Sequence, residues 1–336
     1  MRMTAIAFLL LLASTARAED ADPMRRAIER GLKRLDQGAA SYVKNRQCFS
    51  CHHQSLTVAA LISAQQRGIT IDPARLKQQM DFTLKSFADR KNQILKGQGV
   101  GGASGTVAYG LFTLEAGGHA PDDISAALVE FLLQRQKPDG SWPSSSIRPP
   151  SEGSTFVVNA QALRGLRVYG PAKDAKDAGE LRKRVDAAFE KGRDWLLKNK
   201  PITTEDQWAH LRGLVEAGAD AKLIDAARNA LLKQQREDGS WSQLPDRDGD
   251  AYATGAVLMA LRRAGVKADD TAYRKGTAYL LKTQRDDGAW IVETRSKPIQ
   301  VFFDNGDPGG KSQFISFAAT GWAVLALLET VHETKP

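Results

Sequence analysis

Two kinds of apolar pattern alternate along the chain. Segments of the first kind are apolar on one face only and begin at an aspartate, as in "DPMRRAIERGLKRLDQGAASYV" (22–43) and "DPARLKQQMDFTLKSF" (72–87). Segments of the second kind are apolar over most of their length and rich in alanine and glycine, as in "SLTVAALISAQQRG" (55–68) and "SFAATGWAVLALLE" (316–329). The first pattern predicts amphipathic helices with aspartate N-caps, and the second predicts buried helices.

The alternation recurs along the whole chain and predicts six helix pairs. The other amphipathic segments lie at 122–134, 220–233 and 269–282, with one more ending near "DWLLKNKPITTED" (194–206). The other buried segments lie at 102–118, 153–170, 206–220 and 249–265.

Three amphipathic segments end in near copies of one another. They read "LLQRQKPDGSWP" (132–143), "LLKQQREDGSWSQ" (231–243) and "LLKTQRDDGAWIV" (280–292). The first two tryptophans are about twice as far apart as the last two, and 194–206 holds a degenerate copy between them. A period of about 50 residues indicates a repeat architecture, and each Asp-Gly predicts a turn that ends the helix.

The Gln-x3-Gly-x-Trp pattern resembles the QW repeat of squalene and oxidosqualene cyclases. This resemblance covers nearly all of the chain after its first 18 residues. It implies an all-α fold: an (α/α)6 toroid of six helix hairpins, with buried helices inside and amphipathic helices outside. Protein prenyltransferases and complement-type thioester domains share that fold. The repeat residues brace helices, so the resemblance concerns fold more than chemistry.

The start of the chain predicts export. Arg2 precedes an apolar run over 5–13, and Ala16-Arg17-Ala18 has the small-x-small form of a signal peptidase site. We expect a signal peptide over 1–18, one toroid domain over 19–336, and a periplasmic or secreted protein without a transmembrane segment. Loss of Arg2 and Arg17 lowers the formal charge from +8 to +6, spread over amphipathic segments, so nucleic acid is not an expected partner.

Both cysteines of the chain lie in "RQCFSCHHQSL" (46–56), just before the first buried helix. Cys48, Cys51 and His52 fit Cys-x-x-Cys-His, in which two thiols attach to the vinyl groups of haem c and the imidazole binds the iron. Export fits this hypothesis, because haem c is attached outside the cytoplasm. No sequence feature selects a sixth iron ligand among Met80, Met259 and His210.

Three alternatives remain open for the same segment. A Cys48–Cys51 disulfide suits an oxidising compartment. Zinc or another metal could use both cysteines with His52 or His53. Cys51 and Gln54 have the Cys-x-x-Gln spacing of complement-type thioester domains, although His-His replaces their Gly-Glu. The whole chain also resembles exported bacterial proteins that combine cyclase-type repeats with a Cys-x-x-Cys-His-His-Gln segment, and that resemblance transfers no activity.

A second hypothesis is a cyclase-like enzyme or an isoprenoid- or lipid-binding protein. Class II cyclases protonate an alkene with an Asp-x-Asp-Asp motif, and Asp246, Asp248 and Asp250 come nearest to it, with Gly249 inserted. The alternative for these residues is a polar turn with Asp250 as an N-cap. The aromatic residues predicted on buried helices fit either a ligand cleft or a packed core: Tyr109, Phe112, Phe156, Trp208, Tyr252, Phe314, Phe317 and Trp322.

The favoured function is electron transfer or redox chemistry by a haem-carrying toroid beside an apolar cleft, with a periplasmic redox partner. The third hypothesis is a non-enzymatic interaction toroid with a local disulfide or thioester. The loop over 291–312 is longer than ordinary connections, so we expect it to cover one mouth of the toroid. Its Phe302, Phe303 and Asp304 would then contact a ligand or pack on the rim.

Overall fold

A computed structural model describes residues 22–172, 179–297 and 301–333, and the predicted signal peptide lies outside these ranges. The amphipathic segments form the outer helices α1 (Pro23–Asn45), α3 (Pro73–Ala88), α6 (Asp123–Arg135), α8 (Gly179–Lys198), α10 (Ala221–Leu232) and α12 (Thr271–Thr283). A short helix outside these segments, α4 (Lys91–Ile94), follows α3. The buried segments form the inner helices α2 (His53–Gln66), α5 (Ala103–Ala116), α7 (Thr155–Tyr169), α9 (Thr204–Glu216), α11 (Ala251–Arg263) and α13 (Gln313–Leu328).

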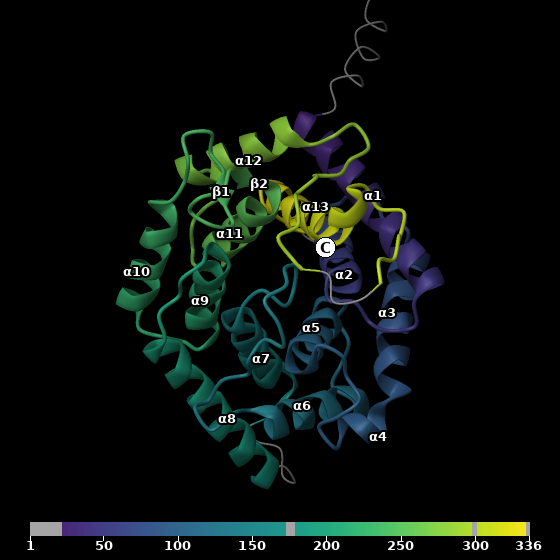
Figure 1. Ribbon diagram of the computed structural model, residues 1–336, viewed down its shortest axis with the longest axis vertical. Coiled ribbons are helices and arrows are strands. Elements are labelled where there is room, and N and C mark those ends of the chain that lie inside the picture. The colour runs from purple at the N-terminus through teal and green to yellow at the C-terminus, as the bar shows by residue number, and fades with distance from the viewer. Residues whose placement is uncertain (1–21, 173–178, 298–300, 334–336) are drawn as a thin grey trace, which may run out of the picture.

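The inner helices form a closed ring, and the outer helices surround it (Figure 1). Each inner helix contacts the next, and α13 returns to α2. The described part also holds a 3-10 turn, η1 (Gly310–Ser312), and two short antiparallel strands, β1 (Trp241–Ser242) and β2 (Gly249–Asp250). The predicted all-α toroid is confirmed.

Burial separates the two sets of helices as their sequences require. On α1, the apolar stripe that includes Ile28, Leu32 and Leu35 is buried, while the opposite face is exposed. In contrast, every residue of α13 from 315 to 328 is buried. Small residues allow this close packing, because a side chain at Gly255 or Gly321 would overlap the neighbouring inner helix.

The repeated motif joins each outer helix to the next. In the second copy, the Gln235 side-chain amide donates to the Gly239 carbonyl (2.9 Å) and to the Ala272 carbonyl of α12 (2.7 Å). In the third copy, Gln284 donates to the Ala27 carbonyl of α1 (2.8 Å), so the last repeat closes the ring. The repeat residues therefore have an architectural role.

One described helix, Gly310–Leu328, is long and apolar enough by composition to cross a membrane. Because 83% of that window is buried inside the protein, the innermost position of α13 accounts for its apolar character.

Candidate functional site

The Cys-x-x-Cys-His-His-Gln segment forms the turn that enters α2. The Ser50 hydroxyl accepts a hydrogen bond from the His53 amide (3.3 Å), and Gln54 Oε1 accepts one from the Ser50 amide (2.9 Å). These two reciprocal bonds satisfy amide groups that a helix start leaves unpaired. The Gln54 amide nitrogen donates to Gln79 Oε1 (3.0 Å), so the Gln54 carboxamide acts here as a helix cap rather than as a partner of Cys51.

Both cysteines are free thiols in the structure, and their surroundings differ. Cys48 is exposed, with Sγ 3.6 Å from the Tyr42 hydroxyl. Cys51 is partly buried and its Sγ lies 3.7 Å from Thr106 Oγ1 on α5. Burial raises the pKa of the Cys51 thiol to about 12, because the thiolate would lose its hydration. Cys51 is therefore protonated at neutral pH.

The two histidines form a chain of hydrogen bonds that ends on an aspartate. Asp307 Oδ2 lies 2.9 Å from His53 Nε2, and His53 Nδ1 lies 2.8 Å from His52 Nδ1. His53 and Asp307 are both buried, and Asn305 Nδ2 donates to Asp307 Oδ2 at 2.8 Å. Burial lowers the pKa of His53 despite the opposing effect of Asp307, and burial together with His53 lowers the pKa of His52. Both imidazoles are therefore neutral at pH 7.

This chain of hydrogen bonds determines which nitrogen of each imidazole ring carries a hydrogen atom. A carboxylate only accepts, so His53 Nε2 donates to Asp307, and the neutral ring then presents Nδ1 as an acceptor. His52 Nδ1 must donate to it, which leaves His52 Nε2 with a free lone pair. Ser50 Oγ, 2.9 Å from His52 Nδ1, can accept from the same group. His52 Nε2 is therefore available to bind a metal ion.

Aromatic rings hold the two imidazoles from α13 and α1. The His52 ring stacks on Phe314 at 5.3 Å, and the His53 ring stacks on Phe317 at 4.0 Å and on Tyr42 at 4.7 Å between centroids. Phe314 and Phe317, which the sequence assigned to a cleft or a core, thus belong to the surroundings of the histidines.

The loop before α13 supplies the residues that sequence reasoning missed. It named Phe302, Phe303 and Asp304, and all three are exposed or partly exposed. Instead, the buried Asn305 and Asp307 reach inward: Asn305 Nδ2 donates to the Gly38 carbonyl of α1 (2.9 Å), and Asp307 meets His53. No local pattern marked these two residues, because their partners lie more than 250 positions away.

The structure does not bring the other residues named from the sequence into this site. His210 Nε2 meets the Leu196 carbonyl (3.0 Å) beside α8, and Met80 packs against Gly117. Asp246 and Asp248 are exposed beyond β1, away from any dry pocket. Asp250 caps α11 by accepting from the Ala253 amide (2.9 Å), as the polar-turn alternative expects.

A buried carboxyl group elsewhere in the ring has a raised pKa. Glu205, in the first turn of α9, is 4% exposed and accepts from the Tyr252 hydroxyl (3.1 Å). Arg295 lies 3.4 Å from its other oxygen. Burial raises the pKa of Glu205 to about 7, against the opposing effects of Arg295 and Tyr252. The sequence placed Glu205 in a degenerate repeat copy and gave no reason to select it.

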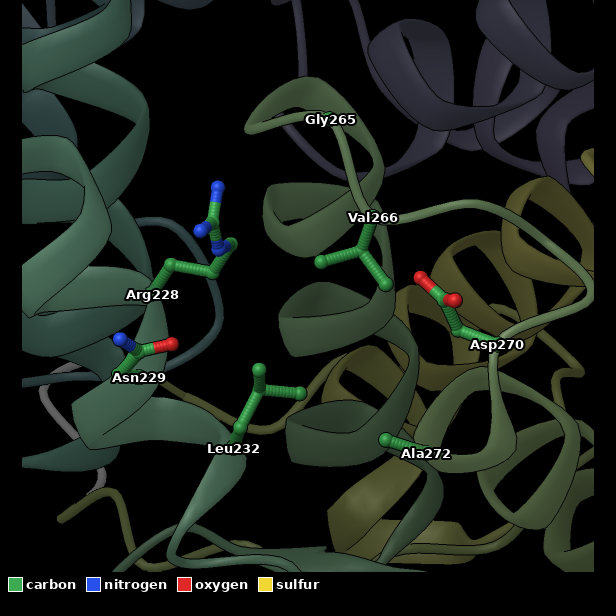
Figure 2. A pocket seen from close by; sticks show the side chains of 7 residues that line it. All are labelled: Arg228, Asn229, Leu232, Gly265, Val266, Asp270 and Ala272. Atoms are coloured by element: carbon green, nitrogen blue, oxygen red, sulfur yellow. The ribbon is translucent and has the colours of Figure 1, made fainter. Parts of the chain in front are cut away.

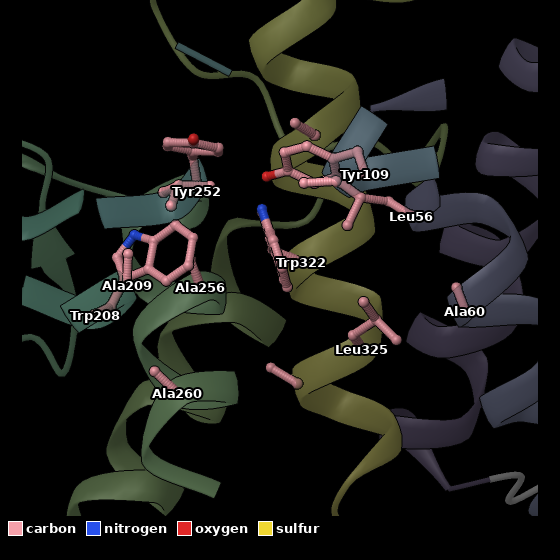
Figure 3. Close-up of a cluster of buried hydrophobic side chains, with 14 of the residues drawn as sticks. Leu56, Ala60, Tyr109, Trp208, Ala209, Tyr252, Ala256, Ala260, Trp322 and Leu325 are labelled. Atoms are coloured by element: carbon pink, nitrogen blue, oxygen red, sulfur yellow. The ribbon is translucent and has the colours of Figure 1, made fainter. Parts of the chain in front are cut away.

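Aromatic side chains from several inner helices form a buried cluster in the interior of the ring (Figure 3). Tyr109, Trp208, Tyr252 and Trp322 are each 2–4% exposed. Two depressions in the described structure, of about 370 and 400 Å³, instead lie at the outer wall. The first is formed by residues of α10 and of the turn between α11 and α12, with Arg228, Val266 and Asp270 at its edges (Figure 2). It contains none of the residues discussed above.

Comparisons with known proteins agree with this architecture. The family model for the squalene-hopene cyclase N-terminal domain matches residues 195–280. The squalene–hopene cyclase of Bradyrhizobium diazoefficiens is 28% identical over 273 residues, which cover 66% of this chain and 39% of that protein. The chain is therefore similar to proteins of the squalene/terpene cyclase-like superfamily. It spans about two fifths of the length of that curated relative.

Solved structures extend the likeness of this cyclase-like protein to the whole fold. The apo type II terpene cyclase MstE from Scytonema has a TM-score of 0.55 at 15% identity, over 90% of this chain and 98% of that one. A structure described as a wild-type glycosidase gives 0.58 at 10% identity, with the same coverage. At these identities the likeness concerns the fold alone, and one fold can host different chemistries.

The buried carboxyl gives this cyclase-like protein a predictable pH dependence. An unfolded chain releases the Glu205 proton near its ordinary pKa of 4.5, whereas the folded protein holds it up to about 7. Between these values the folded state binds more protons, so the free energy of unfolding falls as pH rises, by about 3 kcal/mol in total. Glu205→Gln, which keeps an acceptor for Tyr252, should therefore be more stable than wild type at pH 8 and similar to it at pH 4.

Urea unfolding from pH 4 to 8 measures this difference. Glu237→Gln, at an exposed glutamate, is the matched control and should leave the wild-type pH profile unchanged. Parallel pH profiles for Glu205→Gln and wild type would contradict the assignment.

Proposed function

We propose that this protein is an exported carrier of haem c, held by thioether bonds to Cys48 and Cys51 with His52 as an axial iron ligand. When bound, the haem would supply one-electron transfer. The observation that carries the proposal is the hydrogen-bonded chain from Asp307 through His53 to His52, which leaves His52 Nε2 unprotonated. The two thiols, free and next to this imidazole in sequence, complete the donor set.

The donor set fits haem better than it fits a metal bound by the protein alone. Thioether attachment needs two thiols that reach two separate vinyl groups, and only one imidazole must reach the iron. A zinc site needs three or four side chains that converge on one point. In the ranges that the structure describes, no three His, Cys, Asp or Glu side chains are arranged to hold a metal ion.

Exposed apolar side chains on two loops that contact each other support a large flat ligand. Val301 and Phe302 are 89% and 55% exposed on the loop before α13, and Ile147 is 81% exposed on the loop before α7. The two loops meet where the Ser296 hydroxyl donates to the Pro149 carbonyl (2.6 Å). Exposed apolar side chains that are near one another often mark a ligand or partner surface, and a haem edge would cover them.

The test is the visible spectrum of protein exported in a host that matures haem c, followed by denaturation and intact mass. The proposal expects a Soret band that remains with the unfolded chain and an added mass of one haem. A colourless protein with an unmodified mass from that host would overturn it.

The role of Asp307 gives a further prediction. Asp307→Asn replaces the anionic acceptor of His53 by a neutral one, so His52 becomes a less basic ligand and stabilises ferric iron less. We expect the midpoint potential to rise by about 60 mV, which corresponds to a tenfold change for one electron. Redox titration measures it, with Asp304→Asn, an exposed carboxyl on the same loop, as the control. Equal midpoint potentials for Asp307→Asn and wild type would show that the chain of hydrogen bonds from Asp307 does not act on His52.

A second candidate is an enzyme that protonates an isoprenoid or another apolar substrate, and Glu205 favours it. This carboxyl is buried, holds its proton near neutral pH, and lies among the aromatic residues Tyr252 and Tyr109. It meets the requirement for a general acid better than Asp246 or Asp248. Under this candidate, cyclisation of an added polyprenyl substrate would disappear in Glu205→Gln and persist when Cys48 and Cys51 are replaced.

A further inference from the structure

Arg212, in the third turn of α9, is a charged residue that is buried without a paired acceptor. Its side chain is 91% buried, at 9% exposure, yet no hydrogen bond or ion pair to it occurs within the described residues. Its guanidinium carbon lies 5.9 Å from the rings of both Trp208 and Trp322. These ring contacts compensate part of the charge but leave the in-plane N–H donors unpaired.

Neighbouring arginines show how different this environment is. Arg164 and Arg263 both meet Glu216, at 3.0 Å in each case. Arg212 receives only the longer-range effect of Glu216, and burial and the charge of Arg164 lower the pKa of Arg212 to about 10. A guanidinium that keeps only 9% exposure and has no paired acceptor is costly, because it has lost most of its hydration without replacement.

A second unpaired group lies on the adjacent inner helix. Gln161 on α7 is 2% exposed, and both its amide nitrogen and its amide oxygen lack a partner in the described structure. Gln161 precedes Arg164 by three residues, so the two share a face of α7. Arg164 in turn is near enough to Arg212 to repel it. Because α7 packs against α9, the two unpaired groups lie on adjacent inner helices.

We infer that Arg212 is the anchor of a binding site for a carboxylate in the interior of the ring, with Gln161 as a second donor. A guanidinium presents parallel N–H groups that match the two oxygens of a carboxylate, and such a pair is strongest where water is excluded. Trp208 and Trp322 form apolar walls beside it. The inference is independent of the proposed haem, since none of these residues contacts Cys48, Cys51 or His52.

The carboxylate could belong to a small metabolite or to the head of a fatty acid, and two probes distinguish these sources. Acetate and octanoate are titrated into the full-length protein, with acetamide and octan-1-ol as uncharged counterparts. Fluorescence of Trp208 and Trp322 and the thermal midpoint report binding. We expect acetate or octanoate to bind and to raise the midpoint, and the uncharged counterparts to have no effect. Binding of acetate indicates a small anion, and binding of octanoate alone indicates a fatty acid.

Arg212→Met separates a ligand anchor from a structural residue. We expect affinity for the carboxylate to fall about tenfold to hundredfold. The thermal midpoint without ligand should stay equal or rise, because methionine removes an uncompensated charge. Arg263→Met, which removes a paired arginine from the same end of the ring, should leave the affinity unchanged.

Arg212→Lys provides a second measurement if the methionine variant does not fold. It keeps the charge but loses the bidentate fork, so affinity should fall by a smaller factor. Absence of carboxylate binding by wild type, or equal affinity in wild type and the folded Arg212 variants, would overturn the inference.

Discussion

Replacement of both Cys48 and Cys51 by serine is expected to give a colourless protein in a host that attaches haem to the wild-type chain. Serine is close to cysteine in shape but forms no thioether bond. The effect is complete loss, because neither attachment point remains. The measurement is the Soret absorbance per chain, together with the mass of the denatured protein.

Single variants refine this result. Cys48→Ser retains the partly buried Cys51, and Cys51→Ser retains the exposed Cys48, so each should hold haem by one bond at reduced yield. His53→Gln leaves both cysteines and His52 in place. Its haem attachment is the reference against which that of the cysteine variants is compared. An unchanged Soret band in the double variant would place any haem elsewhere and refute the assignment.

Replacement of Trp241 by alanine is expected to lower the free energy of unfolding by about 3–5 kcal/mol, which is typical of a fully buried aromatic residue. Trp241 is 1% exposed at the end of the second repeat copy. Its indole nitrogen donates to the Leu231 carbonyl of α10 (2.8 Å), and its amide donates to Thr254 of α11 (2.9 Å). Trp241 therefore joins an outer helix to the next inner one, through its indole on the first side and its backbone amide on the second.

Urea unfolding measures the loss. Trp241→Phe separates the packing of the ring from its hydrogen bond. The ring contact is retained and the Leu231 carbonyl keeps the Gln234 amide as a donor, so we expect a loss of about 0.5–1.5 kcal/mol. Trp142 and Trp290 make the same bond to Leu132 and Leu280, so their alanine variants should behave alike. A loss below about 1 kcal/mol in Trp241→Ala would contradict the bracing role.

The architecture was predictable because its determinants are local and repeated. Periodicity separated the inner helices from the outer ones, since a buried helix must be apolar on most faces and a peripheral helix on one. The Asp-Gly turns and their tryptophans recur in register, and each makes the same set of bonds within about ten residues. Asp250 as a helix cap was likewise readable from its position before the helix.

The chemistry of the site was predictable only in part. The sequence selects Cys48, Cys51 and His52 as candidates, because their spacing is itself the signal. It did not identify Asp307, which determines the hydrogen positions on both imidazoles, because ring closure alone brings the loop before α13 to the start of α2.

The sequence by itself determined the helices, their pairing and the thiol–imidazole motif, all of which depend on contacts between residues near one another in the chain. Only the tertiary structure decided which polar side chains lost water and which found partners. Glu205, Arg212 and Gln161 sit on helices that look alike in sequence, yet ring closure buried all three. Long-range pairing of a polar side chain depends on the position of every other helix, so no local pattern can encode it.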